Sequence, residues 1–145
     1  MDKSLKEKFD TPCLVVDEEI VRENIREMQN EADNNGCILR PHIKTHKTPY
    51  LAKLQVGAGA CGITSCKVSE VMADNGFDDI FIAYPLVGAR KLERACALSK
   101  RIKRLILAID NLAQAEPLAL AAQTHNQVLE VRIEVDCGGG RTGAE

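Results

Sequence analysis

The chain is poor in aromatic residues. Tyr, Phe and Trp together make up 3% of its 145 residues, and Trp is absent. Leu, Ile, Val and Ala must therefore build the core, and a hydrophobic fraction of 45% excludes a disordered chain. Without aromatic side chains on which bases could stack, the local basic clusters do not predict a site for single-stranded nucleic acid.

An excess of charge of either sign is also missing. Nineteen Lys and Arg residues against 21 Asp and Glu give a net charge of -2, whereas a nucleic-acid-binding domain is usually basic. No apolar run approaches the length that crosses a bilayer. Residues 1–8 are charged and lack the apolar stretch of a signal peptide. We therefore expect a cytoplasmic protein with no nucleic-acid partner and no membrane association.

The six cysteines include no Cys-x-x-Cys pair. Most of them lie in apolar or strand-like segments, which predicts buried, reduced thiols of the kind found in cytoplasmic proteins. Cys61, Cys66, His42 and His46 could in principle surround a zinc ion. Their spacing, however, matches none of the common zinc-binding patterns.

The hydrophobic pattern alternates between the periods of strands and of helices. The predicted strands are residues 11–16, 38–44, 61–64, 80–84, 105–109 and 128–135. The predicted helices begin at caps or first turns marked by Asp17, Thr48-Pro49, Ser69, Gly88 and Asp110, and the first three end at Gly36, Gly57 and Gly76. Pro117 should break or restart the last helix, and residues 136–143 form a glycine-rich turn.

Strands that are apolar on both faces and separated by helices predict an α/β fold with a parallel sheet. Two architectures are open: a doubly wound sheet, or part of an eight-stranded β/α barrel, whose full form needs about 250 residues. Five strands, starting with residues 38–44, belong to the repeating units, and residues 11–16 lie outside them. In both architectures the functional site lies at the carboxyl ends of the strands.

One of those ends carries an unusual cluster of cationic side chains. Residues 40–47 contain three Lys or Arg residues and two imidazoles. In a strand, Arg40, His42 and Lys44 would point to the same side. Like charge and partial burial would then favour the uncharged amine of Lys44, which can attack a carbonyl group. A solvated, basic edge strand is the alternative. Pro41 cannot donate to a ladder, so we expect a bulge or one-sided pairing there.

The segment Arg40-Pro41-His42-Ile43-Lys44-Thr45-His46-Lys47-Thr48 resembles the signature of the D-threonine aldolase and D-serine dehydratase family. These enzymes use pyridoxal 5'-phosphate (PLP) and share the barrel of the alanine racemase N-terminal type. Four further stretches resemble the family in the same order: residues 11–17, 62–64, 76–88 and 136–143. The resemblance therefore extends from Thr11 to the end of the chain.

The resemblance implies specific roles for four residues. Lys44 matches the lysine that holds PLP as an internal aldimine, and Arg141 matches the arginine beside the ring phenolate of the cofactor. His42 and Tyr84 match positions that line the same cavity. The implied activity is that of a lyase, an aldolase or a dehydratase, acting on small-molecule D-β-hydroxy amino acids. The family also uses a divalent metal (Zn, Mn or Mg), whose ligands match no residue of this chain.

The resemblance also implies an incomplete domain. We expect an N-terminal coil at residues 1–10 and a PLP-binding barrel domain at residues 11–145 with about five of the eight βα units. The remaining barrel strands and the C-terminal β domain of the family would be absent, so the chain alone should have little lyase activity. Two alternatives are a non-catalytic PLP-binding homeostasis-type protein and an inactive fragment of the lyase. The family suggests a homodimer or a monomer.

Overall fold

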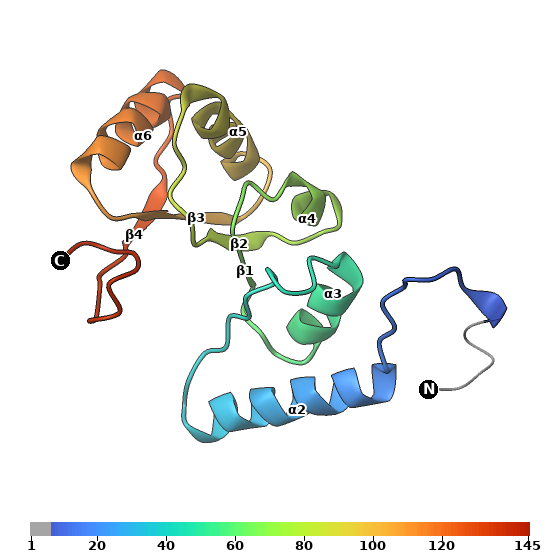
Figure 1. The fold of residues 1–145 in the computed structure, drawn as a ribbon. Helices are drawn as coiled ribbons and strands as arrows, with labels where there is room; N and C mark the ends of the chain where they lie inside the picture. The colour runs from blue at the N-terminus through green and yellow to red at the C-terminus, as the bar shows by residue number, and fades with distance from the viewer. Residues whose placement is uncertain (1–6) are drawn as a thin grey trace.

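The structure is a computed structural model, and it describes residues 7–145. Helices and strands alternate along the chain in the manner expected from the sequence (Figure 1). Their bounds are α2 Glu18–Asn34, α3 Pro49–Gly57, β1 Ile63–Ser65, α4 Glu70–Asp74, β2 Asp79–Ile82, α5 Ala89–Ser99, β3 Arg104–Ile109, α6 Leu112–Thr124 and β4 Glu130–Ile133.

The four strands form one parallel sheet in the order β1-β2-β3-β4. Each strand is joined to the next by a helix, and α4, α5 and α6 lie on the same side of the sheet in Figure 1. A doubly wound sheet reverses its strand order at a switch point, whereas strands that follow one another around a wall are typical of a β/α barrel. The sheet is therefore part of a barrel.

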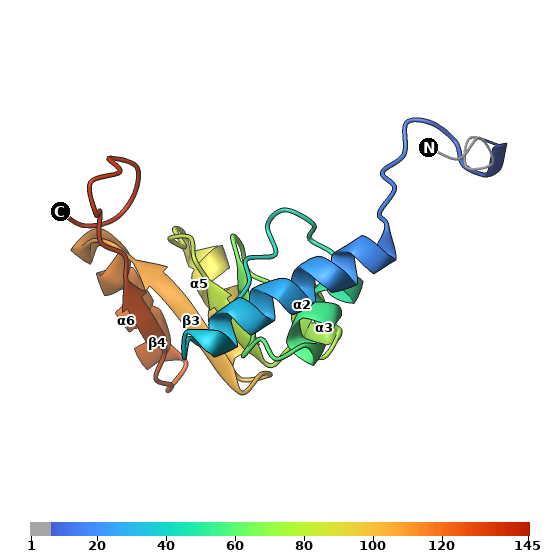
Figure 2. The same cartoon turned by 90° about the horizontal axis from the view of Figure 1, so that it is seen from below.

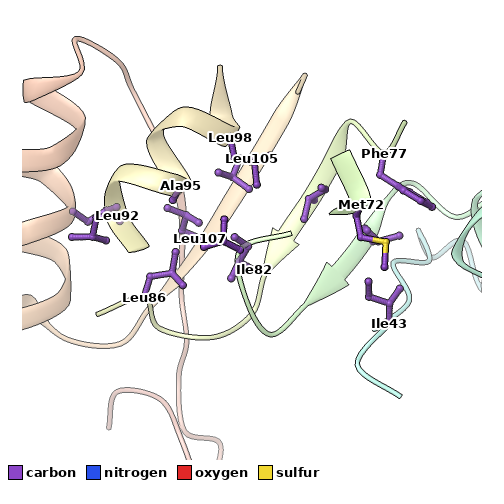
Figure 3. Close-up of a cluster of buried hydrophobic side chains, with 14 of the residues drawn as sticks. Ile43, Met72, Phe77, Ile82, Leu86, Leu92, Ala95, Leu98, Leu105 and Leu107 are labelled. Atoms are coloured by element: carbon purple, nitrogen blue, oxygen red, sulfur yellow. The ribbon is translucent and has the colours of Figure 1, made fainter. Parts of the chain in front are cut away.

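The core lies between the sheet and the helices that connect its strands. Ile80 and Ile82 of β2 and Leu105 and Leu107 of β3 are buried and point to the same face of the sheet. Helix α5 covers this face with Leu92, Ala95 and Leu98 (Figure 3). Alternate residues of the same strands, including Phe81, Arg104 and Ile106, point to the other face and border a cavity of about 560 Å³.

The strand expected at residues 38–44 is reduced to a single bridge between His42 and Thr64. Thr64 N–H donates to Pro41 O at 2.8 Å, and Ile43 N–H donates to Thr64 O at 2.9 Å. Cys61 N–H donates to a carbonyl of the same segment, that of Leu39, at 3.0 Å. Pro41 accepts but cannot donate, so the ladder loses one bond. The one-sided pairing expected at this proline is confirmed.

The strand expected at residues 11–16 is wrong. The backbone of this segment has no strand partner within residues 7–145, and Leu14 is fully exposed. Figure 2 shows the segment leading away from the rest of the chain before α2 begins. An isolated strand cannot satisfy its own backbone donors and acceptors, so strong β-forming residues alone do not make one. Most of the coil expected at residues 1–10 lies outside the described residues.

The helix caps follow the sequence only in part. Asp17 caps α2, because its carboxylate accepts from the backbone N–H groups of Glu19 and Ile20. Ser69 precedes α4 but makes no capping bond. Asp110 does not cap α6; its neighbour Asn111 does, through a bond from the N–H of the residue three positions on.

Pro117 does not break or restart the last helix. Helix α6 runs continuously from Leu112 to Thr124 with the proline inside it. A proline at the sixth helical position removes one backbone hydrogen bond, but α6 packs against α5, and Pro117 and Leu120 of α6 border a groove with Leu92 of α5. Tertiary packing therefore outweighs the local preference.

The expectation of buried cysteines is also wrong for most of them. All six thiols are free, and only Cys96 is buried. The zinc arrangement considered from the sequence is not formed, because residues 7–145 contain no group of three or more His, Cys, Asp or Glu side chains placed to hold a metal ion. In the same part of the chain, no helix has the length and hydropathy required to span a membrane.

Candidate active site

The candidate site is a cavity of about 580 Å³ at the carboxyl ends of the strands. Two loops form it: the loop that follows the His42–Thr64 bridge, and the loop between β1 and α4. Its polar lining includes Lys44 and Lys47 from the first loop and Cys66 and Lys67 from the second. No Asp or Glu is among the residues that line it. We call it the lysine cavity.

Lys44, the residue to which the sequence assigns the central role, lines this cavity and is exposed. The partial burial expected for this side chain is therefore wrong. The neighbouring cations expected there are present, because Lys47 and Lys67 line the same space. The amine can be reached by a small molecule from solvent.

His42 lies beside the cavity between Lys44 and Cys66. The backbone N–H of Lys44 donates to His42 Nδ1 at 3.3 Å. The neutral ring therefore carries its proton on Nε2, which lies 3.6 Å from the sulfur of Cys66. Burial lowers the pKa of His42 below its ordinary value and the charge of Lys44 lowers it further, against an opposing hydrogen bond with the backbone of Thr64. The site favours a neutral imidazole.

Two buried serines hold the second loop in place. Ser65 Oγ donates to the carbonyl of Lys67 at 2.8 Å, and Ser69 Oγ lies 2.6 Å from Ser65 Oγ and 2.9 Å from the same carbonyl. These bonds fold the loop back on itself, so that the exposed side chains of Cys66 and Lys67 line the cavity. The sequence indicated Ser69 only as a helix cap, and no local pattern predicts its bond to Ser65.

The first loop is a single closed turn. The backbone N–H of Lys47 donates to the carbonyl of Ile43 at 2.8 Å, and Lys47 has a φ of +53°. His46 lies on the side of the turn away from the cavity, where Thr48 N–H donates to its Nδ1 and Gln55 Oε1 lies 3.3 Å from its Nε2. His46 is therefore part of the loop structure, while the two lysines of the turn face the cavity.

Arg40, which the sequence placed with the cationic cluster, does not belong to the site. Its Nη1 forms an ion pair with Asp79 Oδ1 at 2.8 Å, and both side chains are largely buried. Arg104 lies 3.7 Å from the other carboxylate oxygen of Asp79 and pairs bidentately with Glu130. The guanidinium of Arg104 lowers the pKa of Glu130. These charges neutralise one another at the amino ends of β2 and β3, away from the lysines.

Tyr84 and Arg141 follow β2 and β4, so they lie beyond the same ends of the strands. Both are exposed, and neither lines the lysine cavity. Within residues 7–145 no hydrogen bond joins either of them to Lys44 or His42. The loop that carries Arg141 is ordered by Asp136, whose carboxylate accepts from the backbone N–H groups of the three glycines at residues 138–140. The turn predicted there is confirmed.

The residues of the lysine cavity fit PLP. Its volume lies in the range of sites for small cofactors. It offers the primary amine of Lys44 to an aldehyde, and Lys47 and Lys67 supply positive charge for an anionic cofactor. No carboxylate lines the cavity to repel one.

Comparison with known proteins agrees with this architecture. The family model described as "Alanine racemase, N-terminal domain" matches residues 16–145. The chain belongs to this family. The partial barrel inferred from the strand order is thus the N-terminal domain fold of alanine racemases.

Relatives of this chain include aldolases and dehydratases. D-threonine aldolase of an Arthrobacter species is 37% identical over 138 residues, which are 94% of this chain and 36% of that protein. D-serine dehydratase of Dictyostelium discoideum is 32% identical over 147 residues, covering 94% and 37% of the two chains. The solved structure of D-threo-3-hydroxyaspartate dehydratase from Delftia sp. HT23 superposes with a TM-score of 0.87 at 36% identity, covering 93% and 36%.

These comparisons confirm the resemblance to the D-threonine aldolase and D-serine dehydratase family. The chain spans little more than a third of the length of these relatives. The matched part of this chain includes Lys44 and the residues of the lysine cavity.

Proposed function

We propose that this chain supplies the lysine-bearing part of a PLP-dependent lyase that acts on D-β-hydroxy amino acids, as an aldolase or a dehydratase. The supporting observation is the exposed amine of Lys44 in a cavity lined by three lysines and no carboxylate. The names of its relatives give the same reaction classes: an aldolase for D-threonine, and dehydratases for D-serine and D-threo-3-hydroxyaspartate.

Lys44 is the catalytic residue of the proposal. Its primary amine would hold the cofactor by condensing with the PLP aldehyde, with loss of water. The cofactor supplies an electron sink for breaking a bond at the substrate's α- or β-carbon. The ammonium groups of Lys47 and Lys67 line the same space and would attract the anionic cofactor.

His42, Tyr84 and Arg141 complete the proposed cofactor site. The neutral imidazole of His42 fixes the turn that carries Lys44, because it accepts the backbone N–H of that residue. Tyr84 and Arg141 belong to the proposal by their place at the strand ends. A divalent metal ion near the substrate hydroxyl is part of the same proposal, and we assign no residue of this chain to it.

The experiment titrates the purified chain with PLP and follows the absorbance of the lysine–cofactor imine. Borohydride then reduces the imine to a stable secondary amine, which peptide mass spectrometry locates. We expect the label on Lys44. The band should be lost in Lys44→Ala and retained in Lys53→Ala, the matched control, because Lys53 is an exposed lysine on α3 outside the cavity.

Failure to label Lys44 while other lysines react would overturn the assignment. Turnover assays with D-threonine and D-serine then separate the possible activities. Glycine and an aldehyde identify an aldolase, and an oxoacid with ammonia identifies a dehydratase. A labelled chain that releases neither product supports either a PLP-binding protein without turnover or an inactive fragment of the lyase.

A further inference from the structure

Cys66 is an exposed thiol that the proposed chemistry of Lys44 does not use. It lines the lysine cavity from the loop between β1 and α4. The buried hydroxyls of Ser65 and Ser69 both bond to the carbonyl of Lys67, so the backbone directly after the cysteine is fixed. The sulfur is therefore held at the cavity, and a reagent can reach it from solvent.

The imidazole of His42 makes a direct contact with this sulfur. Its Nδ1 accepts the backbone N–H of Lys44, so the neutral ring carries its hydrogen on Nε2, 3.6 Å from Cys66 Sγ. Cysteines that react with disulfides and other electrophiles are typically exposed and lie beside His or Lys side chains. Cys66 has both of these properties.

The other cysteines lack this arrangement. Cys37 and Cys137 are exposed, but each donates its thiol hydrogen to the backbone carbonyl two residues before it, at 3.5 and 3.7 Å. Cys96 is buried in the core. Within residues 7–145, Cys66 is the only cysteine whose sulfur has an imidazole as its hydrogen-bond partner. The chain therefore contains its own reference thiols.

The charge of the cavity selects among the reagents that can reach Cys66. Three lysines line the cavity, and no Asp or Glu does. Lys67 directly follows the cysteine in the chain, and neither it nor Lys47 forms a salt bridge within residues 7–145. A reagent with negative charge is therefore attracted to this cavity.

We propose that Cys66 is a site of covalent modification by small disulfides that carry carboxylates, and that the adduct occupies the lysine cavity. The sulfur of Cys66 attacks one sulfur of the disulfide, so that a new sulfur–sulfur bond forms and the old one breaks. The leaving half takes up the proton that Cys66 releases and departs as a thiol. Cys66 is thereby oxidised and the departing half is reduced. Because Lys44 lines the same cavity, the adduct excludes other ligands from its amine.

The test treats the reduced chain with oxidised glutathione, which is negatively charged, or with cystamine, a disulfide with two ammonium groups. Peptide mass spectrometry follows the modification of each cysteine with time. We expect oxidised glutathione to modify Cys66 about tenfold faster than Cys37, and cystamine to show a smaller preference. Added salt should reduce the preference of oxidised glutathione. Equal rates at the two cysteines, or an equal preference with cystamine, would overturn the proposal.

Two variants test the neighbours of the sulfur. His42→Leu removes the ring N–H and should slow the modification of Cys66 about tenfold. Lys67→Ala should reduce the preference for oxidised glutathione, whereas Lys53→Ala, the matched change on α3 outside the cavity, should not. Cys96 reports on folding in each variant, because its buried thiol reacts only when the core opens. Wild-type rates at Cys66 in folded His42→Leu and Lys67→Ala chains would overturn the proposal.

A second readout, which rests on the proposed function, is the PLP imine of Lys44. Complete modification of Cys66 should abolish the imine band, and removal of the adduct with a phosphine should restore it. Cys66→Ser treated with the same disulfide is the control and should keep the band. An unchanged band in the modified chain would overturn the placement of the adduct in the cavity. A chain with no band before treatment overturns the proposed function, whereas the rates at Cys66 and Cys37 still decide this inference.

Discussion

Gly62 has no side chain beyond a hydrogen atom, and this leaves room for an ion pair between Arg40 and Asp79. A Cβ at this position would lie 2.5 Å from the backbone oxygen of Asp79 and 2.6 Å from Nη1 of Arg40. The guanidinium therefore passes directly beside this glycine, which precedes β1, to reach its carboxylate partner. This pairing removes Arg40 from the cationic cluster and leaves the lysines as the unbalanced charges.

We expect Gly62→Ala to lower the free energy of unfolding by about 1–3 kcal/mol, because the added methyl group displaces either the backbone of β2 or a largely buried ion pair. Urea unfolding followed by circular dichroism measures this change. Gly57→Ala is the matched control, since nothing lies within 4 Å of its Cβ position and alanine favours the end of α3. Equal stability of Gly62→Ala and the wild type would show that Arg40 can reach Asp79 by another path.

Among the elements, α6 departs most from its local sequence preference. Asn111 caps it and Leu118 is buried beneath it, but Pro117 leaves the carbonyl of Ala113 without its helical donor. The helix persists because its packing against α5 and the burial of Leu118 in the core exceed the loss of one backbone bond. The hydrophobic periodicity of the sequence predicted the position of this helix correctly. The prediction that Pro117 breaks or restarts the helix was wrong.

Pro117→Ala should therefore stabilise the chain, by about 1–3 kcal/mol, since it restores a backbone donor inside a formed helix. Helicity by circular dichroism should rise slightly, and the urea midpoint should increase. The neighbouring exposed residue provides the control, as Glu116→Ala is expected to change stability by less than about 0.5 kcal/mol. A destabilised Pro117→Ala would mean that contacts of the ring in the groove with α5 outweigh the backbone bond.

For the whole molecule, the notable property is the amount of apolar surface in contact with solvent. Leu14, Ile20 and Met28 are each more than half exposed along the N-terminal segment and α2. Near the C-terminus, Ile133 at the end of β4 and Val135 just after it are also exposed. Strand β4 pairs with β3 along one edge, and its other edge has no partner within residues 7–145. Exposed apolar residues beside an unpaired strand edge favour association.

We expect the isolated 145-residue polypeptide to self-associate in a concentration-dependent manner, as measured by size-exclusion chromatography with light scattering. Leu14→Lys combined with Ile20→Lys should reduce the association. Asn30→Lys, which adds charge at an exposed polar position of α2, is the control for net charge and should have little effect. A single monomeric species at all concentrations would contradict this expectation.

Much of the wall of the barrel could be predicted from local pattern. The bounds of α3 agree with the prediction, β2 and β3 lie within two residues of the expected strands, and Asp17 caps α2. These features depend on alternation, helical periodicity and capping chemistry, which neighbouring residues determine. Residues 11–16 have the same local preference for a strand, yet form none, because a strand also needs a partner that pairs with its backbone.

The amino-acid sequence by itself determined the order of most strands and helices, the family, and the presence of Lys44 in a cluster of cations. Tertiary structure decided which of those cations remain unpaired. Arg40 meets Asp79 from a distant part of the chain, and Lys67 comes to lie with Lys44 in one cavity through the bonds of two buried serines. Charge balance in a site depends on distances through space, and these are set only when the strands assemble side by side.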